Sequence, residues 1–227
     1  LLRNLLDKVG ISKTERLSNG RLAVPEYPAI CLGAVDISLY QMTSAYTTFA
    51  NQGTYREPVF VLSITDKNGR EIYQANPTIR PAINPLYNAI MVDMLKNVVG
   101  GEFGMGLKTE NGGKTGTTND YSDGWFMGIT PTLVVGVWTG GDDKWIRFTN
   151  LNDGQGYVTA RPVFQKFIKK LENDTTGIFD YKVRFAPAPE GMAEMIDCDK
   201  IKTVRPATER WQTQKEKMKR DEFEEDF

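Results

Sequence analysis

The sequence predicts an α+β protein in which helices flank an antiparallel sheet. Three segments rich in β-branched and aromatic residues follow one another with only turn residues between them, at 114–118, 125–129 and 133–139. Short connections of this kind join antiparallel neighbours. Segments with a helical spacing of apolar residues come before and after this block, at about 38–52, 84–99 and 162–171.

Length and composition limit the classes of function. At 227 residues with 40% hydrophobic content, the chain can bury one sizeable core. A formal net charge of -1 indicates neither nucleic acid nor an anionic membrane as a partner. Histidine is absent, which excludes Ser-His-Asp triads, Cys-His dyads and the usual zinc sites. Proton transfer would depend on Lys, Tyr, Asp, Glu or a hydroxyl group.

The first helix is expected at the very start of the chain. Leu1, Leu5 and Val9 fall on one helical face, and Gly10 follows as a stop signal. Residues 12–35 are interpreted as loop with a brief buried segment at 29–33. Within it Cys31 is predicted to be a small core residue, in preference to a disulfide partner of the distant Cys198.

A second helix is predicted over 38–52. Ser38 and Gln41 form a capping-box pattern, and apolar residues from Leu39 to Phe49 then recur at steps of three and four, with the tyrosines and Met42 expected in the core. After it, 59–65 and 71–74 are predicted to pair as a hairpin around Asn68-Gly69, away from the chemistry.

The remaining elements follow in order. Residues 75–84 are interpreted as a Pro-rich connector, and Asn84 with Pro85 begins a helix that reaches about Val99. The three strands of the sheet come next, with Trp125 and Trp138 expected to pack beneath the site. Asp142, Asp143 and Asp153 are read as solvated loop acids and not as a metal cluster.

After the final helix the character of the chain changes. Residues 179–185 could add a strand, and the dense charge of 205–227 predicts a solvated helix or a disordered tail. The sequence therefore divides into 1–172, which holds the predicted fold, and a C-terminal extension, 173–227.

The densest chemistry lies in Gly112–Asp120. Glycines on both sides of Lys114 remove the Cβ atoms that would keep a ligand away from the backbone. Lys114 offers a compact positive charge, and Thr115, Thr117 and Thr118 offer hydroxyl donors. This pattern predicts a site for an anionic substrate.

A nucleotide-binding phosphate loop is the first alternative for this stretch. That motif requires a glycine at position 108, where the chain has Lys108, and it must open a helix. Residues 119–124 are instead a run of turn formers. The phosphate-loop interpretation is therefore excluded.

Further motifs surround Gly113–Asp120. They are Ala45-Tyr46, Phe49-Ala-Asn-Gln-Gly53 and Pro58 before it, and Asp123-Gly-Trp-Phe-Met-Gly-Ile-Thr-Pro131, Val135-Gly-Val-Trp138 and Gly140-Gly-Asp-Asp143 after it. In this order they resemble the transpeptidase domain of class A penicillin-binding proteins, over roughly residues 1–172, with Lys114-Thr115-Gly116 as the third signature of the penicillin-recognising serine enzymes. The resemblance implies the serine β-lactamase and D,D-transpeptidase fold.

The resemblance also implies roles for individual residues. Lys114, Thr115 and Gly116 would belong to the catalytic signature. Lys114 and the hydroxyls of Thr115, Thr117 and Thr118 would bind the carboxylate of a peptide ending in D-Ala-D-Ala, or that of a β-lactam. The Thr117 amide would form half of an oxyanion hole. No cofactor and no metal are implied.

The family's nucleophile is a serine with a lysine three residues later. The chain's serines all lack Lys at +3 and Asn at +2; they are Ser12, Ser18, Ser38, Ser44, Ser63 and Ser122. Neither the nucleophile nor the family's Ser-x-Asn loop is therefore in this chain. We expect an excised piece of a longer protein, cut just downstream of Ser-x-Asn and inactive alone.

The resemblance predicts the whole protein's setting. The expected function is cross-linking of peptidoglycan stem peptides on the periplasmic side of the bacterial inner membrane. An N-terminal glycosyltransferase and membrane anchor, and cell-wall assembly proteins as partners, are implied with it. A β-lactamase is one alternative, although it lacks the long motifs around residues 49–53 and 123–131, and a non-catalytic cell-wall scaffold is another.

Overall fold

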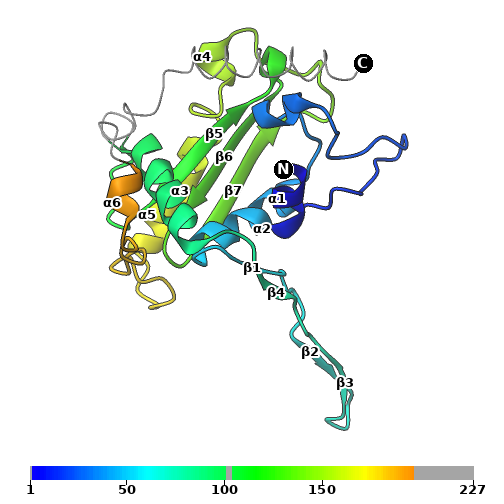
Figure 1. Ribbon diagram of the computed structural model, residues 1–227, viewed down its shortest axis with the longest axis vertical. Coiled ribbons are helices and arrows are strands. Elements are labelled where there is room, and N and C mark those ends of the chain that lie inside the picture. Colours follow the sequence, from blue (N-terminus) through cyan, green and yellow to red (C-terminus); the bar gives the residue numbers. More distant parts are fainter. Residues whose placement is uncertain (1, 101–103, 197–227) are drawn as a thin grey trace, which may run out of the picture. The chain divides into compact units, whose positions relative to one another are not determined.

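The computed structural model describes residues 2–100 and 104–196 (Figure 1). The chain divides into two compact units, Leu1–Ala188 and Pro189–Phe227. In the second unit the described residues contain the short helix α6 (Met192–Met195). All of the other described helices and strands lie in the first unit.

The predicted antiparallel sheet is confirmed. Strands β5 (Gly112–Thr117), β6 (Asp123–Ile129) and β7 (Val134–Gly140) are hydrogen-bonded in that order. Thr115 lies opposite Phe126, which in turn lies opposite Val137. In the turn between β6 and β7, the Thr130 amide donates to the Leu133 carbonyl. Among the described residues β5 pairs on one side only, so its other edge is open within this sheet.

Helices cover both faces of the sheet, as Figure 1 shows. Helices α2 (Leu39–Ala50) and α3 (Pro85–Val98) pack on one face, here called the α2/α3 face, and α5 (Arg161–Glu172) packs on the other, the α5 face. A Cβ added at Gly136 would meet Leu39 of α2, whereas one added at Gly128 would meet Phe164 of α5. The core therefore consists of two layers separated by the sheet.

The aromatic pair of Phe126 and Phe164 lies at the centre of the α5 layer. Both side chains are fully buried, and their ring centroids are 5.0 Å apart. Ile168 joins them from the next turn of α5. On the other face Ile129 packs against Val92 and Leu95 of α3.

The predicted helix starts are confirmed in atomic detail. At α2 the Ser38 hydroxyl accepts from the Gln41 amide, and the Gln41 side chain accepts from the Ser38 amide, which completes the capping box. At α3 the Asn84 side chain accepts from the Leu86 amide, and Pro85 occupies the first turn. Helix α1 (Leu2–Lys8) precedes Gly10, whose φ is +90°.

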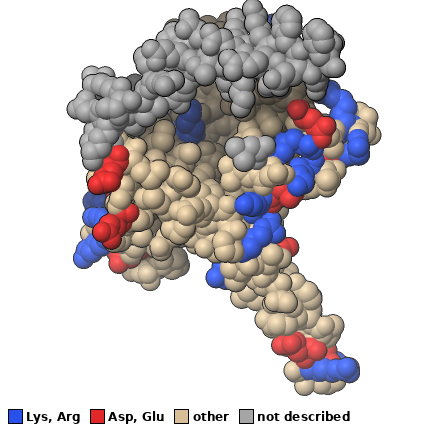
Figure 2. Space-filling model, in the orientation of Figure 1, with Lys and Arg blue, Asp and Glu red and all other residues tan. Residues whose placement is uncertain are grey.

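The predicted hairpin forms, but it is shorter than expected. Strand β2 is Ser63–Thr65 and β3 is Glu71–Gln74, so residues 59–62 are not strand. The Pro-rich connector contains a strand that the sequence did not predict, β4 (Ile79–Pro81), which pairs with β1 (Thr54–Arg56). All residues of β2 and β3 are exposed. Figure 2 shows uncharged surface along the hairpin and charge at its tip.

Four expectations about burial and local structure are wrong. Cys31 is exposed and free, because the short 3-10 helix Pro28–Leu32 lies at the surface and its Leu32 is 91% exposed. A brief apolar run without periodicity does not determine burial.

Two aromatic residues that were expected to be buried are exposed. Tyr40 of α2 is one of them. Trp138 is 40% exposed, since it stands near the end of β7 beyond the helices. Residues 179–185 form no strand.

Some of the predicted features lie outside the described residues. Cys198 and the charged tail 205–227, with its predicted helical or disordered character, lie outside the described residues. The short helix α4 (Leu151–Gly154) lies between β7 and α5 in the chain. Within 2–100 and 104–196, none of the helices has the length and apolar character required to cross a bilayer.

Candidate active site

Two carboxylates hold the segment that leads into β5. Glu172, at the end of α5, accepts hydrogen bonds from the amides of Lys108 and Thr109, at 2.7 and 2.8 Å. Glu110 accepts from the Phe185 amide and forms an ion pair with Lys96 of α3. The start of β5 is therefore fixed from both flanking helices.

Burial raises the pKa of Glu110, but hydrogen bonds from Lys96 and the Phe185 amide outweigh this, and its pKa is lowered overall. The carboxylate is therefore ionised at neutral pH and stays paired with Lys96. This ion pair lies before the start of β5, at the end remote from Thr117.

The backbone N–H and C=O groups of successive residues in β5 point alternately toward β6 and toward the open edge. Beyond the strand, the Thr118 amide donates to the Asp123 carbonyl on β6. Since amides alternate in direction along an extended strand, those of Thr117 and Thr115 point away from β6. The Thr117 amide therefore faces the open edge, where an oxyanion could accept from it.

The side chain of Lys114 also reaches this edge. Its Nζ donates to the carbonyl oxygen of Thr115 at 2.8 Å, and the side chain is exposed. That carbonyl points away from β6 by the same alternation. An ammonium group and the Thr117 amide therefore lie along the same edge, which is a suitable arrangement for an anionic ligand.

Thr115 and Thr117 lie on the α5 face, opposite to Lys114. Thr117 Oγ1 accepts a hydrogen bond from the Gly156 amide at 3.1 Å. A hydroxyl has two acceptor lone pairs and one proton, so Thr117 can still donate to a carboxylate. Gly116 lies between these two threonines in the strand. A Cβ atom at this position would lie 3.1 Å from the Cβ of Trp125, so the glycine avoids a tight contact.

Thr118 differs from the other two threonines, because its hydroxyl is engaged in the turn that follows. Thr118 Oγ1 accepts from the Asp123 amide at 2.9 Å and lies 3.1 Å from Asp123 Oδ2 and 3.0 Å from Ser122 Oγ. Asp123 Oδ1 accepts from Trp138 Nε1 at 3.1 Å. Sequence reasoning missed this role of Asp123, although the Thr-x4-Asp spacing across a tight turn signals it.

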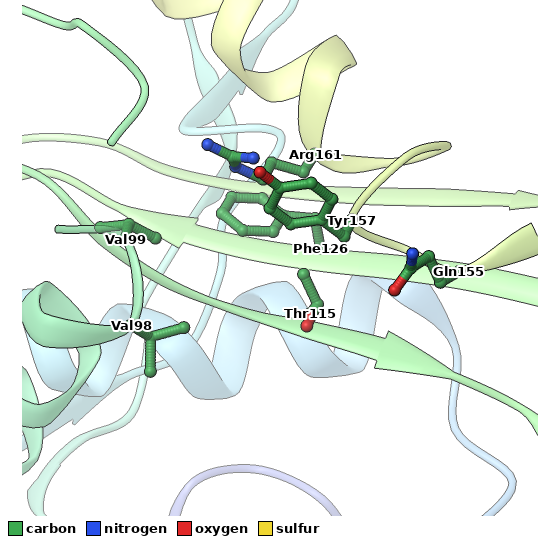
Figure 3. Close-up of a pocket in the computed structure, with 7 residues that line it drawn as sticks. All are labelled: Val98, Val99, Thr115, Phe126, Gln155, Tyr157 and Arg161. Carbon is green, nitrogen blue, oxygen red and sulfur yellow. The ribbon is translucent and has the colours of Figure 1, made fainter. Parts of the chain in front are cut away.

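A cavity of about 410 Å³ opens beside Thr115 (Figure 3). Its lining combines apolar and polar side chains: Val98, Val99, Thr115, Phe126, Gln155, Tyr157 and Arg161. The guanidinium of Arg161 lies 4.3 Å from the centre of the Tyr157 ring and donates to the Gly104 carbonyl. Arg161 is 9% exposed, and sequence reasoning missed it because a residue at the start of a helix gives no sign of facing a cavity.

The predicted site residues therefore lie along the same strand, β5, and just after its end, but their side chains are divided between the two faces of the sheet. Lys114, Gly116 and Thr118 lie on the α2/α3 face, and Thr115 and Thr117 lie on the α5 face. Only an open strand edge lets both sets reach one ligand. Among the described residues, no group of three or more His, Cys, Asp and Glu side chains is placed to hold a metal ion.

Comparison with known proteins decides the family. The family model of the penicillin binding protein transpeptidase domain matches residues 7–169. The chain belongs to this family. It carries part of a penicillin binding protein transpeptidase domain, and the matched region includes all of β5, β6 and β7.

Curated relatives are similar over most of this chain but are much longer. Penicillin-binding protein 1A of Clostridium acetobutylicum is 38% identical over 171 residues, which are 73% of this chain and 20% of that protein. Penicillin-binding protein 1A of Aquifex aeolicus is 37% identical over 150 residues, 62% of this chain and 20% of that protein. The chain thus spans about a fifth of the length of these relatives.

Solved structures show the same fold. The crystal structure of penicillin-binding protein 1A from Haemophilus influenzae has a TM-score of 0.62 and 23% identity, and the match covers 80% of this chain and 32% of that one. PonA1 from Mycobacterium tuberculosis has a TM-score of 0.64 and 22% identity, with 82% of this chain and 53% of that one covered. The fold predicted from the sequence is therefore confirmed.

Proposed function

We propose that this chain is the substrate-binding part of a serine-type D-Ala-D-Ala transpeptidase, which cross-links the stem peptides of peptidoglycan. The observation that carries the proposal is the open edge of β5, where the Lys114 ammonium and the Thr117 amide lie together. Lys114 and the hydroxyls of Thr115 and Thr117 hold the terminal carboxylate of the substrate. A peptide can then lie antiparallel along the edge and use the free backbone groups of the strand.

The reaction is acyl transfer in two steps. A serine elsewhere in the full-length protein attacks the carbonyl carbon of the penultimate D-Ala, and the terminal D-Ala leaves with a proton on its amine. The Thr117 amide donates to the oxyanion of the tetrahedral intermediate, and the serine's own amide supplies the second donor. An amine of a second stem peptide then attacks the acyl-enzyme, releases the serine and completes the cross-link.

β-Lactams carry a carboxylate at a matching position and are the second class of ligand. PonA1 of Mycobacterium tuberculosis, which shares this fold, has been solved in complex with penicillin V. Support also comes from the names of the relatives, all of them penicillin-binding proteins. A β-lactamase activity is less favoured, because the family model that matches is that of a transpeptidase domain.

The setting of the whole protein is part of the proposal. The 1A relatives are about five times as long as the matched segment, which leaves room for a glycosyltransferase, a membrane anchor and the nucleophile. The transpeptidase part then works on the periplasmic side of the bacterial inner membrane, with cell-wall assembly proteins as candidate partners. Residues 1–172 form its transpeptidase portion and 173–227 an extension.

Labelled penicillin tests the proposal. The full-length protein should form a covalent adduct, detected by mass spectrometry, and this chain alone should form none because it lacks a Ser-x-x-Lys serine. In the full-length protein, Lys114→Ala should slow acylation by about a hundredfold, since the carboxylate loses its charged partner. Lys144→Ala, which removes an exposed loop lysine, is the matched control and should acylate normally.

Each half of this test can fail separately. A stable adduct on the isolated chain would refute the argument that the nucleophile lies elsewhere. Unimpaired acylation of Lys114→Ala would remove the role assigned to the open edge of β5. Absence of any adduct on the full-length protein would favour a non-catalytic cell-wall scaffold.

A further inference from the structure

The Thr118 side chain takes the place of a backbone group in the β5–β6 ladder. Thr118 lies opposite Asp123 and its amide donates to the Asp123 carbonyl, but its own carbonyl accepts from the Tyr121 amide in the turn. The Asp123 amide therefore donates to Thr118 Oγ1 at 2.9 Å. When the Ser122 hydroxyl donates to the second lone pair of Thr118 Oγ1, both lone pairs are used. The proton of the Thr118 hydroxyl then points to Asp123 Oδ2 at 3.1 Å.

The Asp123 carboxylate connects this residue to the far strand of the sheet. Its Oδ2 faces the Thr118 hydroxyl, and its Oδ1 accepts from Trp138 Nε1 of β7 at 3.1 Å. Gly140, opposite Asp123 in the register, leaves room for this contact, since a Cβ there would lie 2.4 Å from Trp138 Cζ2 and 2.6 Å from Asp123 Oδ1. Thr118, Asp123 and Trp138 thus form a chain of hydrogen bonds across all three strands.

This chain of hydrogen bonds ends one residue from the amide at the open edge. Thr117 is the last residue of β5, and Asn119–Tyr121 immediately form a 3-10 turn in which Asp120 and Tyr121 have φ values of +60° and +59°. Left-handed conformations at two successive non-glycine residues cost energy and must be held by their surroundings. The bonds of Thr118 to Asp123 hold the strand side of that turn.

We propose that Asp123 and Thr118 are positioning residues, which hold the Thr117 amide in the direction required to bind the oxyanion. This inference deepens the proposed function and rests on it. In place of the substrate contact predicted for it, the Thr118 hydroxyl fixes the end of β5, while Thr115, Thr117 and Lys114 contact the substrate. Asp123 acts through Thr118 and is anchored by Trp138.

The proposal is tested in the full-length protein by the kinetics of acylation with labelled penicillin. Asp123→Asn and Thr118→Val should lower the acylation rate constant about tenfold to a hundredfold, because a misplaced donor no longer matches the developing charge. Dissociation constants for the non-covalent complex should change less than about threefold, since the carboxylate contacts remain. Thr118→Ser retains the hydroxyl and should restore the rate, and Trp138→Phe, which removes only the indole donor, should give a smaller decrease than Asp123→Asn.

The fraction of molecules that react separates positioning from folding. A merely structural role would reduce the number of active molecules and leave the rate constant of each unchanged, and that result would overturn the proposal. Asp143→Asn, in an exposed loop, is the matched control and should behave as wild type. If wild type acylates and the variants match its rate, only this inference fails, whereas failure of wild type to acylate removes the proposed function as well.

Discussion

In the sheet of β5, β6 and β7, alternate residues face α2 and α3 or α5, whereas every residue of the hairpin strands β2 and β3 is exposed. Both regions are antiparallel, and both are joined by short turns. A one-residue slip in the sheet would move Phe126 from the α5 face to the α2/α3 face and away from its partner Phe164, so packing determines the register. In the hairpin only the turn determines it, and the register is in fact irregular between Ile64 and Thr65.

This difference in packing fits a proposed site on the sheet and not on the hairpin. A donor must stay in place to within a fraction of an ångström to act in catalysis, and packed layers on both faces provide that rigidity. The open edge of β5 belongs to such a sheet. The hairpin has open edges too, but every residue of its strands is exposed, so they lack buried packing to hold them in place.

The largest expected effect comes from the centre of the sheet. Phe126→Ala should lower the free energy of unfolding by about 3–5 kcal/mol, since the ring is fully buried against Phe164. Phe60→Ala is the matched control before the hairpin, where the side chain is 83% exposed, and should change stability by less than about 0.5 kcal/mol. Denaturant unfolding of the chain measures both, and equal losses would contradict the comparison.

A smaller effect is expected at the margin of the sheet. Trp138→Ala should cost about 1–2 kcal/mol, because the side chain is only partly buried but donates to Asp123. Trp145→Ala removes an exposed indole in the following loop and should be nearly neutral. Thermal unfolding distinguishes them. A loss at Trp138 as large as that at Phe126 would show that the end of the sheet is as well packed as its centre.

The contribution of Glu110 to the free energy of unfolding should depend on pH. The pKa of Glu110 is lowered in the folded state, so this group stabilises the fold above the ordinary carboxyl pKa, and the contribution is lost as pH falls through the lower folded value. Glu110→Gln should therefore cost about 1 kcal/mol or less at pH 7, after allowance for solvent screening, and the difference from wild type should disappear in acid.

Glu57 is the matched control for this experiment. Its pKa is also lowered, chiefly by the Thr78 amide, but it is fully exposed at the base of the hairpin. Glu57→Gln should therefore change stability less than Glu110→Gln at pH 7. Unfolding curves measured across a pH series would contradict the prediction if the Glu110→Gln difference grew in acid.

The smallest effect is expected on removal of the hairpin. Replacing residues 59–77 by Asn-Gly keeps the pairing of β1 with β4 and deletes a segment in which no residue is buried, together with the contact of Phe60 with Tyr40. Stability should change by less than about 1 kcal/mol, because little apolar surface is buried there. A large drop in the unfolding midpoint would mean that the hairpin supports the sheet.

The sequence by itself determined the elements whose signals are local. Capping residues at Ser38 and Asn84 marked two helix starts, and β-branched runs with turn residues marked the sheet, because these signals act within a few residues. The Gly-Lys-Thr-Gly stretch indicated an anionic ligand for the same reason. A resemblance over several motifs then predicted the family that the comparisons confirmed.

The hydrogen-bonding state of each site hydroxyl became known from the tertiary structure alone. Thr117 and Thr118 are neighbours with the same side chain, yet one hydroxyl can still donate and the other is fully engaged by Asp123 and its surroundings. Exposure of Cys31 and Trp138 likewise depends on which helices cover them. Thr117 meets Gly156, and Trp138 anchors Asp123, from positions distant in the sequence, and a local pattern carries no information about such partners.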